Sequence, residues 1–357
     1  MGLRPYPVGL LLQRIAQNFK KIRANESLKK IDRNSELKCI EFKSASASYE
    51  RYNFLGIWAI VVDWFFFSLV GASSLAITGI IDKLIISKYV RNPLAYLAAL
   101  VILQQIFAIG IIAFAGLGFV YPQSLYALAA GGLQIVLWAS YLRALQVEET
   151  SRVAAMVYVF PIFVFLGAFI FLGEALAWKD YIGGGLLVLS ALLVSYRPVE
   201  GGNPIVSPAL KYMGIFWIFT AVYAIVSKYL LGFMDEWHLI MWSSLGNLVI
   251  ILPMLTVKNI RAEAFRYICG GPFLFSALMA DEVFDFVGRG AFIFAYALGS
   301  VALVSSVAAL QPFVTLIFVV LLGIFMPGVL NEELTQKMLA YKVIAVILII
   351  IGVYLVS

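Results

Sequence analysis

Long apolar segments separated by short polar breaks run through the chain from about residue 64 to its end. The hydrocarbon core of a bilayer is roughly 30 Å thick, so a helix needs about 20 apolar residues to cross it. The sequence predicts ten such helices, at approximately residues 64–86, 94–114, 123–145, 152–172, 180–196, 210–231, 238–257, 272–297, 301–325 and 341–356. We therefore expect an all-α integral membrane protein with ten transmembrane helices.

The composition supports this class and excludes others. Hydrophobic residues make up 62% of the chain, and charged residues only 13%, against roughly a quarter in soluble domains. These values exclude a soluble globular protein, a disordered chain and a nucleic-acid-binding protein. Two cysteines and one histidine provide neither a disulfide framework nor the spacing of a metal site. We expect no metal, no cofactor and no nucleic-acid partner.

The net charge of +6 belongs to residues 1–53, which hold eleven Lys or Arg and five acidic residues. The rest of the chain holds fifteen of each sign, so its net charge is zero. Within this tail Val8, Leu12, Ile15 and Phe19 recur at helical spacing, with basic residues on the opposite face. The pattern predicts a basic amphipathic helix, which either lies on an anionic membrane surface or forms a solvated tail.

The body divides into two halves that look like an internal repeat. A Gly- and Pro-rich break around residues 201–204 separates five predicted spans from five, so we assign residues 54–198 and 199–357 to the two repeats. Placing Pro161 over Pro312 puts Gln134 over Asp285. Because each unit has an odd number of spans, the two units must be inverted. Inverted repeats with a binding site at the midplane between them are a transporter architecture.

Several short motifs resemble a known family. They are Tyr141-Leu-Arg-Ala-Leu, Pro161, the run Phe171-Leu-Gly-Glu174-Ala-Leu and Gly183-Gly-Gly, with Tyr296-Ala-Leu and Pro312 in the second half. Over roughly residues 64–357 the chain resembles the EamA-like family of the drug/metabolite transporter superfamily. This resemblance implies two inverted five-helix repeats, a central cavity lined by the first four helices of each half, and movement of small metabolites, often outward. The tail and the late acidic pair Glu332-Glu333 depart from the family pattern.

A further departure is the charge within the predicted span 272–297. Asp281, Glu282, Asp285 and Arg289 fall within one sector of the helix, roughly 100° wide. A charge at the centre of a membrane helix costs about 2.5–3.5 kcal/mol, so the sector should face the bundle interior or a water-filled cavity. Three carboxylates beside one guanidinium cannot all stay ionised cheaply, so we expect at least one to hold a proton. The four residues form a candidate proton-coupling or cation site, or a structural ion-pair network.

Other polar residues within the predicted spans are further candidates for the cavity: Gln104, Gln105, Gln134, Gln311, Lys83 and Lys228. Each amide either binds substrate or joins two helices, and each lysine either binds an anionic group or reaches to the membrane interface. Pro161 and Pro312 free a backbone carbonyl one turn earlier, so they are candidate bends at the cavity. Glu174, the acid of the family motif, is expected to cap a helix or to join two helices near the interface.

These features predict a secondary transporter or exporter of a small polar metabolite, such as an amino acid or a nucleoside. It would work by alternating access, with protons as candidate coupling ions. A flippase for a lipid-linked sugar and a cation transporter share the fold and stay open. An intramembrane enzyme using the carboxylates of span 272–297 is a weaker alternative, because zinc, nucleophile-elbow and phosphate-loop motifs are missing. The expected partners are the substrate, the lipid bilayer and protons, and a homodimer is left open.

The expected location is the plasma (inner) membrane. The family resemblance implies that both termini are cytoplasmic. However, the loops on the opposite side hold ten basic residues, which conflicts with the usual enrichment of Lys and Arg in cytoplasmic loops. With ten spans, Cys39 and Cys269 should lie on opposite faces of the membrane.

Overall fold

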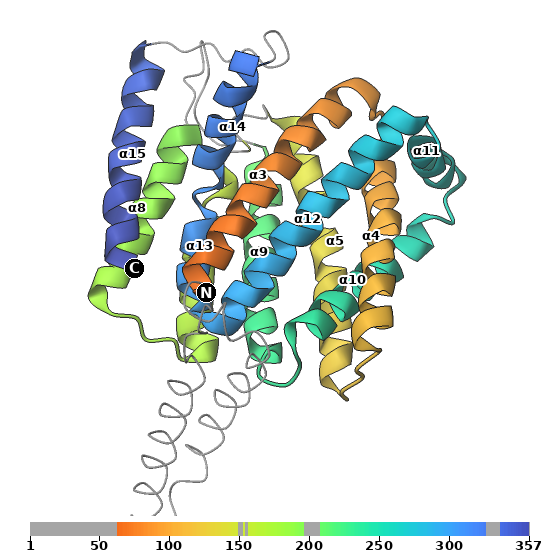
Figure 1. Cartoon of the computed structure of the whole chain (residues 1–357), viewed down its shortest axis with the longest axis horizontal. Coiled ribbons are helices and arrows are strands. Elements are labelled where there is room, and N and C mark those ends of the chain that lie inside the picture. The colour runs from red at the N-terminus through yellow and green to blue at the C-terminus, as the bar shows by residue number, and fades with distance from the viewer. Residues whose placement is uncertain (1–62, 149–152, 154–155, 196–207, 326–335, 357) are drawn as a thin grey trace, which may run out of the picture. The chain divides into compact units, whose positions relative to one another are not determined.

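The computed structural model describes residues 63–148, 153, 156–195, 208–325 and 336–356. The chain separates into two units, residues 1–60 and 61–357, and every described residue lies in the second. The predictions on the basic tail, the break at residues 201–204 and Glu332-Glu333 therefore fall outside the described residues. Throughout the described ranges the regular structure is helical, without any strand, as the sequence predicts (Figure 1).

The helices follow the predicted segments closely. The first half contains α3 (Trp64–Tyr89), α4 (Pro93–Ala115), α5 (Gln123–Val147), α7 (Phe160–Gly167) with the π-helical segment η2 (Ala168–Leu172), and α8 (Trp178–Ser195). The second half contains α9 (Leu210–Leu230), α10 (Glu236–Met254), α11 (Lys258–Ile268), α12 (Pro272–Leu298), α13 (Val301–Ala308), α14 (Gln311–Phe325) and α15 (Gln336–Val356). Every predicted span overlaps one of these helices or a consecutive pair. The short helix α11 was not predicted.

Five of these helices are long and apolar enough to cross a membrane: α3, α4, α5, α9 and α10. Shorter apolar helices cover Phe160–Leu172, Val301–Thr315 and Ile344–Leu355. At 27 residues α12 is long enough to cross, but it carries four charged side chains. The arrangement as ten spans in two inverted repeats stays a prediction.

Polar residues at the breaks fix where several helices begin. The Asn92 side chain accepts hydrogen bonds from the backbone N–H groups of Leu94 and Ala95, and Pro93 occupies the first turn of α4. Asp235 likewise accepts from the backbone N–H of His238 at the start of α10. These side chains satisfy N–H groups that have no partner within the helix, and proline fits a first turn because it lacks an N–H.

The two repeat-related prolines each lie at the start of a new helix. Pro161 is the second residue of α7, after a turn at residues 158–159, and Pro312 is the second residue of α14, after α13 has ended at Ala308. The fourth and ninth segments are therefore interrupted, whereas the sequence predicted a bend. The two interruptions meet in the core, where Tyr158 packs on Ala309.

Helices from the two halves pack against each other. The most extensive contacts join α3 to α12, α8 to α15, and α5 to both α9 and α10. In Figure 1, α3 and α12 run side by side, and α8 and α15 form a pair at one edge. Where α5 crosses α10, a Cβ atom on Gly131 would overlap the carbonyl oxygen of Ser243, and one on Gly246 would overlap that of Leu128. Small residues here allow the two backbones to touch.

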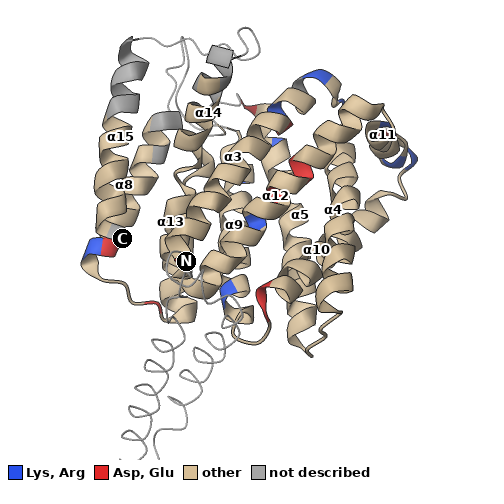
Figure 2. Cartoon of the chain, in the orientation of Figure 1, with Lys and Arg blue, Asp and Glu red and all other residues tan. Residues whose placement is uncertain are grey.

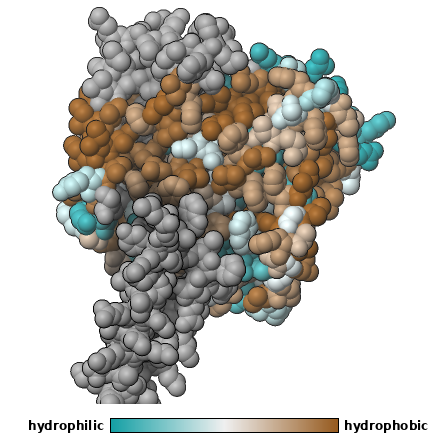
Figure 3. All heavy atoms as spheres, in the orientation of Figure 1, coloured by the Kyte–Doolittle hydropathy of each residue, from teal (hydrophilic) through white to brown (hydrophobic). Residues whose placement is uncertain are grey.

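The outer surface is that of a membrane protein. Many large apolar side chains are exposed, including Phe114, Phe171 and Tyr354, each more than 75% exposed. In Figure 3 apolar residues form a broad band, and hydrophilic residues gather over α11 at one edge. Figure 2 shows few charged residues along the helices, with α12 as the clearest exception.

Candidate functional site

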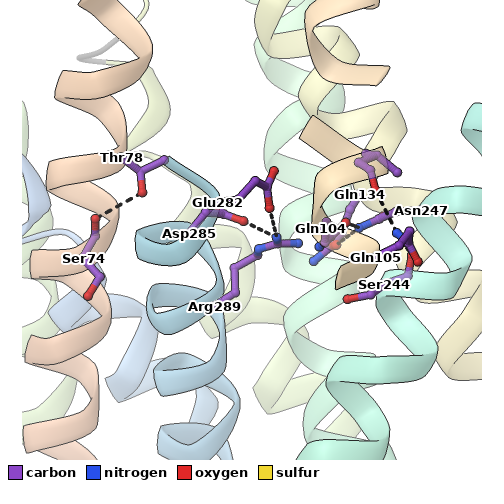
Figure 4. A network of polar contacts seen from close by, with 11 residues as sticks. Ser74, Thr78, Gln104, Gln105, Gln134, Ser244, Asn247, Glu282, Asp285 and Arg289 are labelled. Carbon is purple, nitrogen blue, oxygen red and sulfur yellow. Dashed lines mark hydrogen bonds and ion pairs between the residues drawn. The ribbon is translucent and has the colours of Figure 1, made fainter. Parts of the chain in front are cut away.

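The charged sector of α12 faces the interior of the bundle. Asp281 and Glu282 are 1% and 3% exposed, so these charged side chains do not face lipid, where each would cost several kcal/mol of free energy. One turn later Asp285 forms an ion pair with Arg289, and Glu282 Oε2 lies 4.0 Å from Arg289 Nη2 (Figure 4). The structure therefore brings together the four residues that the sequence groups. Their role in coupling stays a prediction.

A fourth carboxylate belongs to the same cluster. Asp82 on α3 accepts a hydrogen bond from the Tyr96 hydroxyl at 2.6 Å and interacts electrostatically with Asp281 and Asp285. Among the described residues, Asp281 Oδ1 is buried without a hydrogen-bond partner, and Glu282 Oε2, which also lacks a hydrogen bond, has only the 4.0 Å ion pair with Arg289. A buried carboxylate without a partner is costly unless it is neutralised. The excess of acid over base therefore favours binding of a cation, either a proton or a positively charged group of a ligand.

A row of amides continues the charged sector across the bundle. One end of the Gln104 side chain on α4 lies 2.6 Å from Arg289 Nη2, and this end must be its oxygen, because a guanidinium only donates. The Gln104 amide lies 3.2 Å from that of Asn247 on α10, whose Nδ2 donates to Gln134 Oε1 on α5 at 3.1 Å. Figure 4 shows these side chains converging between the helices. We call this set of side chains the polar layer. It consists of Asp281, Glu282, Asp285, Arg289, Gln104, Asn247 and Gln134.

The polar layer borders a small cavity. The cavity has a volume of about 10 Å³, roughly the space of one water molecule. Its polar lining consists of Gln104, Gln134, Tyr223, Ser243, Ser244 and Arg289. The apolar wall includes Phe286, whose ring stacks on Phe107 with 4.7 Å between the centroids.

Sequence reasoning missed several members of this site. Asp82 lies inside the predicted span 64–86, so the rule that identified the charges of α12 would also have identified it. Asn247 is the amide at the centre of the polar layer, and it lies inside the predicted span 238–257. Tyr96 and Tyr223 carry no sequence signal, because aromatic residues occur throughout the apolar segments.

Three of the predicted cavity residues lie outside the polar layer, and two of them join helices. Gln105 Nε2 donates to the backbone oxygens of Val101 and Ser244, at 2.9 and 3.2 Å. Gln311 Nε2 donates to Leu75 O at 3.1 Å and so connects α14 with α3. The Lys83 side chain is exposed on α3. Gln104 and Gln134 are the two predicted amides that the structure brings to the cavity.

Lys228 and Glu174 hold the turn between α12 and α13. Lys228 Nζ donates to Tyr296 O at 2.6 Å and to Gly299 O at 2.8 Å, which satisfies carbonyls at the end of α12. Glu174 accepts from Ser300 Oγ at 2.6 Å and from the Val301 N–H at 3.2 Å, at the start of α13. Both side chains are therefore occupied in fixing this turn. Lys228, predicted as a cavity residue, has a structural role at the helix end in the described state.

The described helices and the polar layer define a class of protein. Membrane helices that enclose a layer of buried polar groups, contributed by both halves of the chain, are typical of secondary transporters. Residues 63–196, from α3 through α8, match the EamA-like transporter family, which belongs to the drug/metabolite transporter superfamily. The resemblance predicted from the sequence is confirmed over these residues. Together with its spans, the match makes the chain an integral, multi-pass membrane protein with the features of a transporter.

A solved structure shows the fold independently. Its description reads only "Crystal structure of protein"; it is 14% identical to this chain, with a TM-score of 0.61. The similarity covers 82% of this chain and 95% of that one, so the shared fold extends beyond the family match into the second half. No curated protein matches the sequence.

Proposed function

We propose that this protein is a secondary transporter that moves a small polar metabolite by alternating access and couples this movement to protons. The observation that carries the proposal is the polar layer. It contains donors and acceptors from α4, α5, α10 and α12, which lie in both halves of the chain. A polar substrate that enters between the halves can exchange its hydrogen bonds with these amides.

The packing supports two inverted repeats. In this arrangement α3 corresponds to α9, α4 to α10, α5 to α12, α7 to α13–α14, and α8 to α15. The contact of α3 with α12 then corresponds to the contact of α5 with α9. The contact of α7 with α9 likewise corresponds to that of α14 with α3, and the pairs α4–α10 and α8–α15 correspond to themselves. A structure built this way can open to either side by rocking one repeat against the other.

Coupling to protons follows from the charge balance of the site. Asp281, Glu282 and Asp285 all interact with the guanidinium of Arg289, which already pairs with Asp285, and Asp82 adds a further acid that interacts with Asp281 and Asp285. When one of the other carboxyl groups loses its proton, it competes with Asp285 for Arg289. That competition moves the guanidinium of Arg289 and so alters its contact with Gln104. Both side chains line the cavity. Proton release is thereby linked to the shape of the substrate site.

The proposed location is the plasma membrane, with both termini cytoplasmic. In this orientation Cys269, which is exposed after α11, lies on the outer face and Cys39 on the inner face. A membrane-impermeant thiol reagent added to intact cells should label Cys269 alone. Labelling of Cys39 alone would reverse the orientation, and labelling of both would contradict the ten-span arrangement.

Transport by the purified full-length protein tests the function. Vesicles containing the protein should take up or release a labelled amino acid, nucleoside or sugar faster than empty vesicles. A pH gradient should change the extent of accumulation. Transport that does not respond to the gradient would remove the proton coupling, and movement of a lipid-linked sugar alone would support a flippase. If none of these compounds moves, the proposed transport is wrong.

A further inference from the structure

We propose that α11, together with the turn between α3 and α4, is a binding surface for the anionic headgroups of membrane lipids. The surface consists of exposed basic and aromatic side chains at one end of the bundle, and we call it the basic end. Its basic residues are Lys88, Arg91, Lys258, Arg261 and Arg266. The residues of the polar layer do not take part.

The position of α11 places it at the membrane boundary. It connects α10 to α12, and Figure 1 shows it running across the ends of the neighbouring helices rather than along them. The Tyr267 hydroxyl fixes it there by accepting hydrogen bonds from the backbone N–H groups of Arg91 and Asn92, at 3.0 and 3.2 Å. A helix held across the end of a bundle that spans a bilayer lies at the level of the lipid headgroups.

The exposed face of α11 has the composition of an interfacial helix. Ala264 and Tyr267 are buried against the bundle, whereas Lys258, Arg261 and Arg266 are exposed. Basic side chains on an exposed face are attracted to anionic lipids, and exposed aromatic rings suit the interface. Phe265 is 51% exposed on the same helix, and at the neighbouring helix ends Tyr89 and Phe273 are 43% and 69% exposed.

The charge of the basic end is largely uncompensated. Of its five basic side chains, Arg266 pairs with Glu263 at 3.3 Å. In the described part of the chain, the ion pairs do not include Lys88, Arg91, Lys258 or Arg261. A crevice of about 70 Å³ between α4 and α5 lies next to this surface. Its polar lining includes Asn92 and Arg143. The remaining lining includes Leu94 and Leu142, which are suited to contact with an acyl chain.

Binding at the basic end also bears on α12. Only residues 269–271 separate the end of α11 from the start of α12, the helix that carries the charged sector. A headgroup bound to α11 therefore fixes the level of the first turn of α12 in the membrane.

Energy transfer from Cys269 measures the lipid composition next to α11. The full-length protein with Cys39→Ser carries a donor dye on Cys269, which is exposed at the end of α11. It is placed in phosphatidylcholine vesicles with a trace of acceptor-labelled phosphatidylglycerol or of acceptor-labelled phosphatidylcholine. We expect stronger transfer to phosphatidylglycerol, and the preference should weaken at high salt. Equal transfer to the two lipids would overturn the proposal.

Charge variants identify the residues responsible. Each of Lys258→Gln, Arg261→Gln and Arg266→Gln should lower the preference for phosphatidylglycerol, by up to about fivefold per charge. The charge-conserving change Arg261→Lys should keep the preference, and so should Lys179→Gln, which removes an exposed base at the start of α8. An Arg261→Gln variant that unfolds at the same temperature as the parent but keeps the full preference would also overturn the proposal.

Discussion

Removing Arg289 should destabilise the protein in a way that depends on pH. In Arg289→Met the long side chain is kept but its charge is lost, so Asp285 loses its ion-pair partner and Glu282 loses a base 4.0 Å away. Breaking a buried ion pair by removing one partner costs about 3–5 kcal/mol. Arg289 is 21% exposed and other carboxylates are near, so we expect about 3 kcal/mol at neutral pH.

The pH dependence has a defined sign. Protonation removes the charge of a carboxylate that has lost its base, so the destabilisation should be greatest at high pH and shrink as the pH falls. A second substitution tests the cause. In Arg289→Met/Asp285→Asn the unpaired charge at residue 285 is gone, so more than half of the lost stability should return.

The assay is reversible denaturant unfolding of the purified protein in detergent, followed by tryptophan fluorescence at pH 5 and pH 8. Arg289→Lys serves as the matched control, because it keeps the charge and should lose less stability than Arg289→Met. A loss below about 1 kcal/mol at both pH values would refute the reasoning. So would a double variant no more stable than Arg289→Met.

Three further substitutions test the packing and the helix ends. Lys228→Met should lower the free energy of unfolding by about 2–3 kcal/mol, because two carbonyls at the end of α12 lose a charged donor. Lys83→Met, which removes an exposed lysine of α3, should have little effect. Glu174→Gln should cost about 1–2 kcal/mol, because the neutral amide is a weaker acceptor for Ser300 and Val301; equal stability of the two proteins would argue against the cap. Gly131→Ala should prevent close packing of α5 on α10 and lower the yield of folded protein, whereas Gly214→Ala, which has open space around its Cβ position, should not. Unfolding curves and yields of detergent-purified protein measure all three.

The sequence predicted the helices well because the bilayer imposes a physical length on each apolar segment. Every predicted span overlaps a described helix or a consecutive pair. The predicted break at Asn92-Pro93 also marks a helix start, whereas Pro161 and Pro312, predicted as bends within spans, lie at the starts of new helices. The short helix α11 was missed, because an eleven-residue polar segment between two spans reads as a loop.

The sequence predicts the site residues whose exposure to lipid would cost much free energy. It does not predict those whose position depends on how the helices pack. Four charges on one side of α12 must avoid lipid, and the structure buries Asp281 and Glu282 and leaves Asp285 and Arg289 only partly exposed. An amide has no such constraint, so Gln104 could not be distinguished from its neighbour Gln105 without knowing how α4 is rotated. The structure places Gln104 beside Arg289 and Gln105 against α10. Lys228 depends in the same way on the position of a distant helix end.

Proton-coupled transport through the α12 carboxylates can be tested by comparing the parent protein with a variant of Asp285. The full-length protein and Asp285→Asn are reconstituted in vesicles. Uptake of the amino acid, nucleoside or sugar that the parent protein transports is compared with and without a pH gradient. The gradient should drive accumulation by the parent protein. Asp285→Asn should fold but no longer respond to the gradient. An Asp285→Asn protein whose accumulation still follows the pH gradient, as the parent's does, would contradict proton coupling through Asp285.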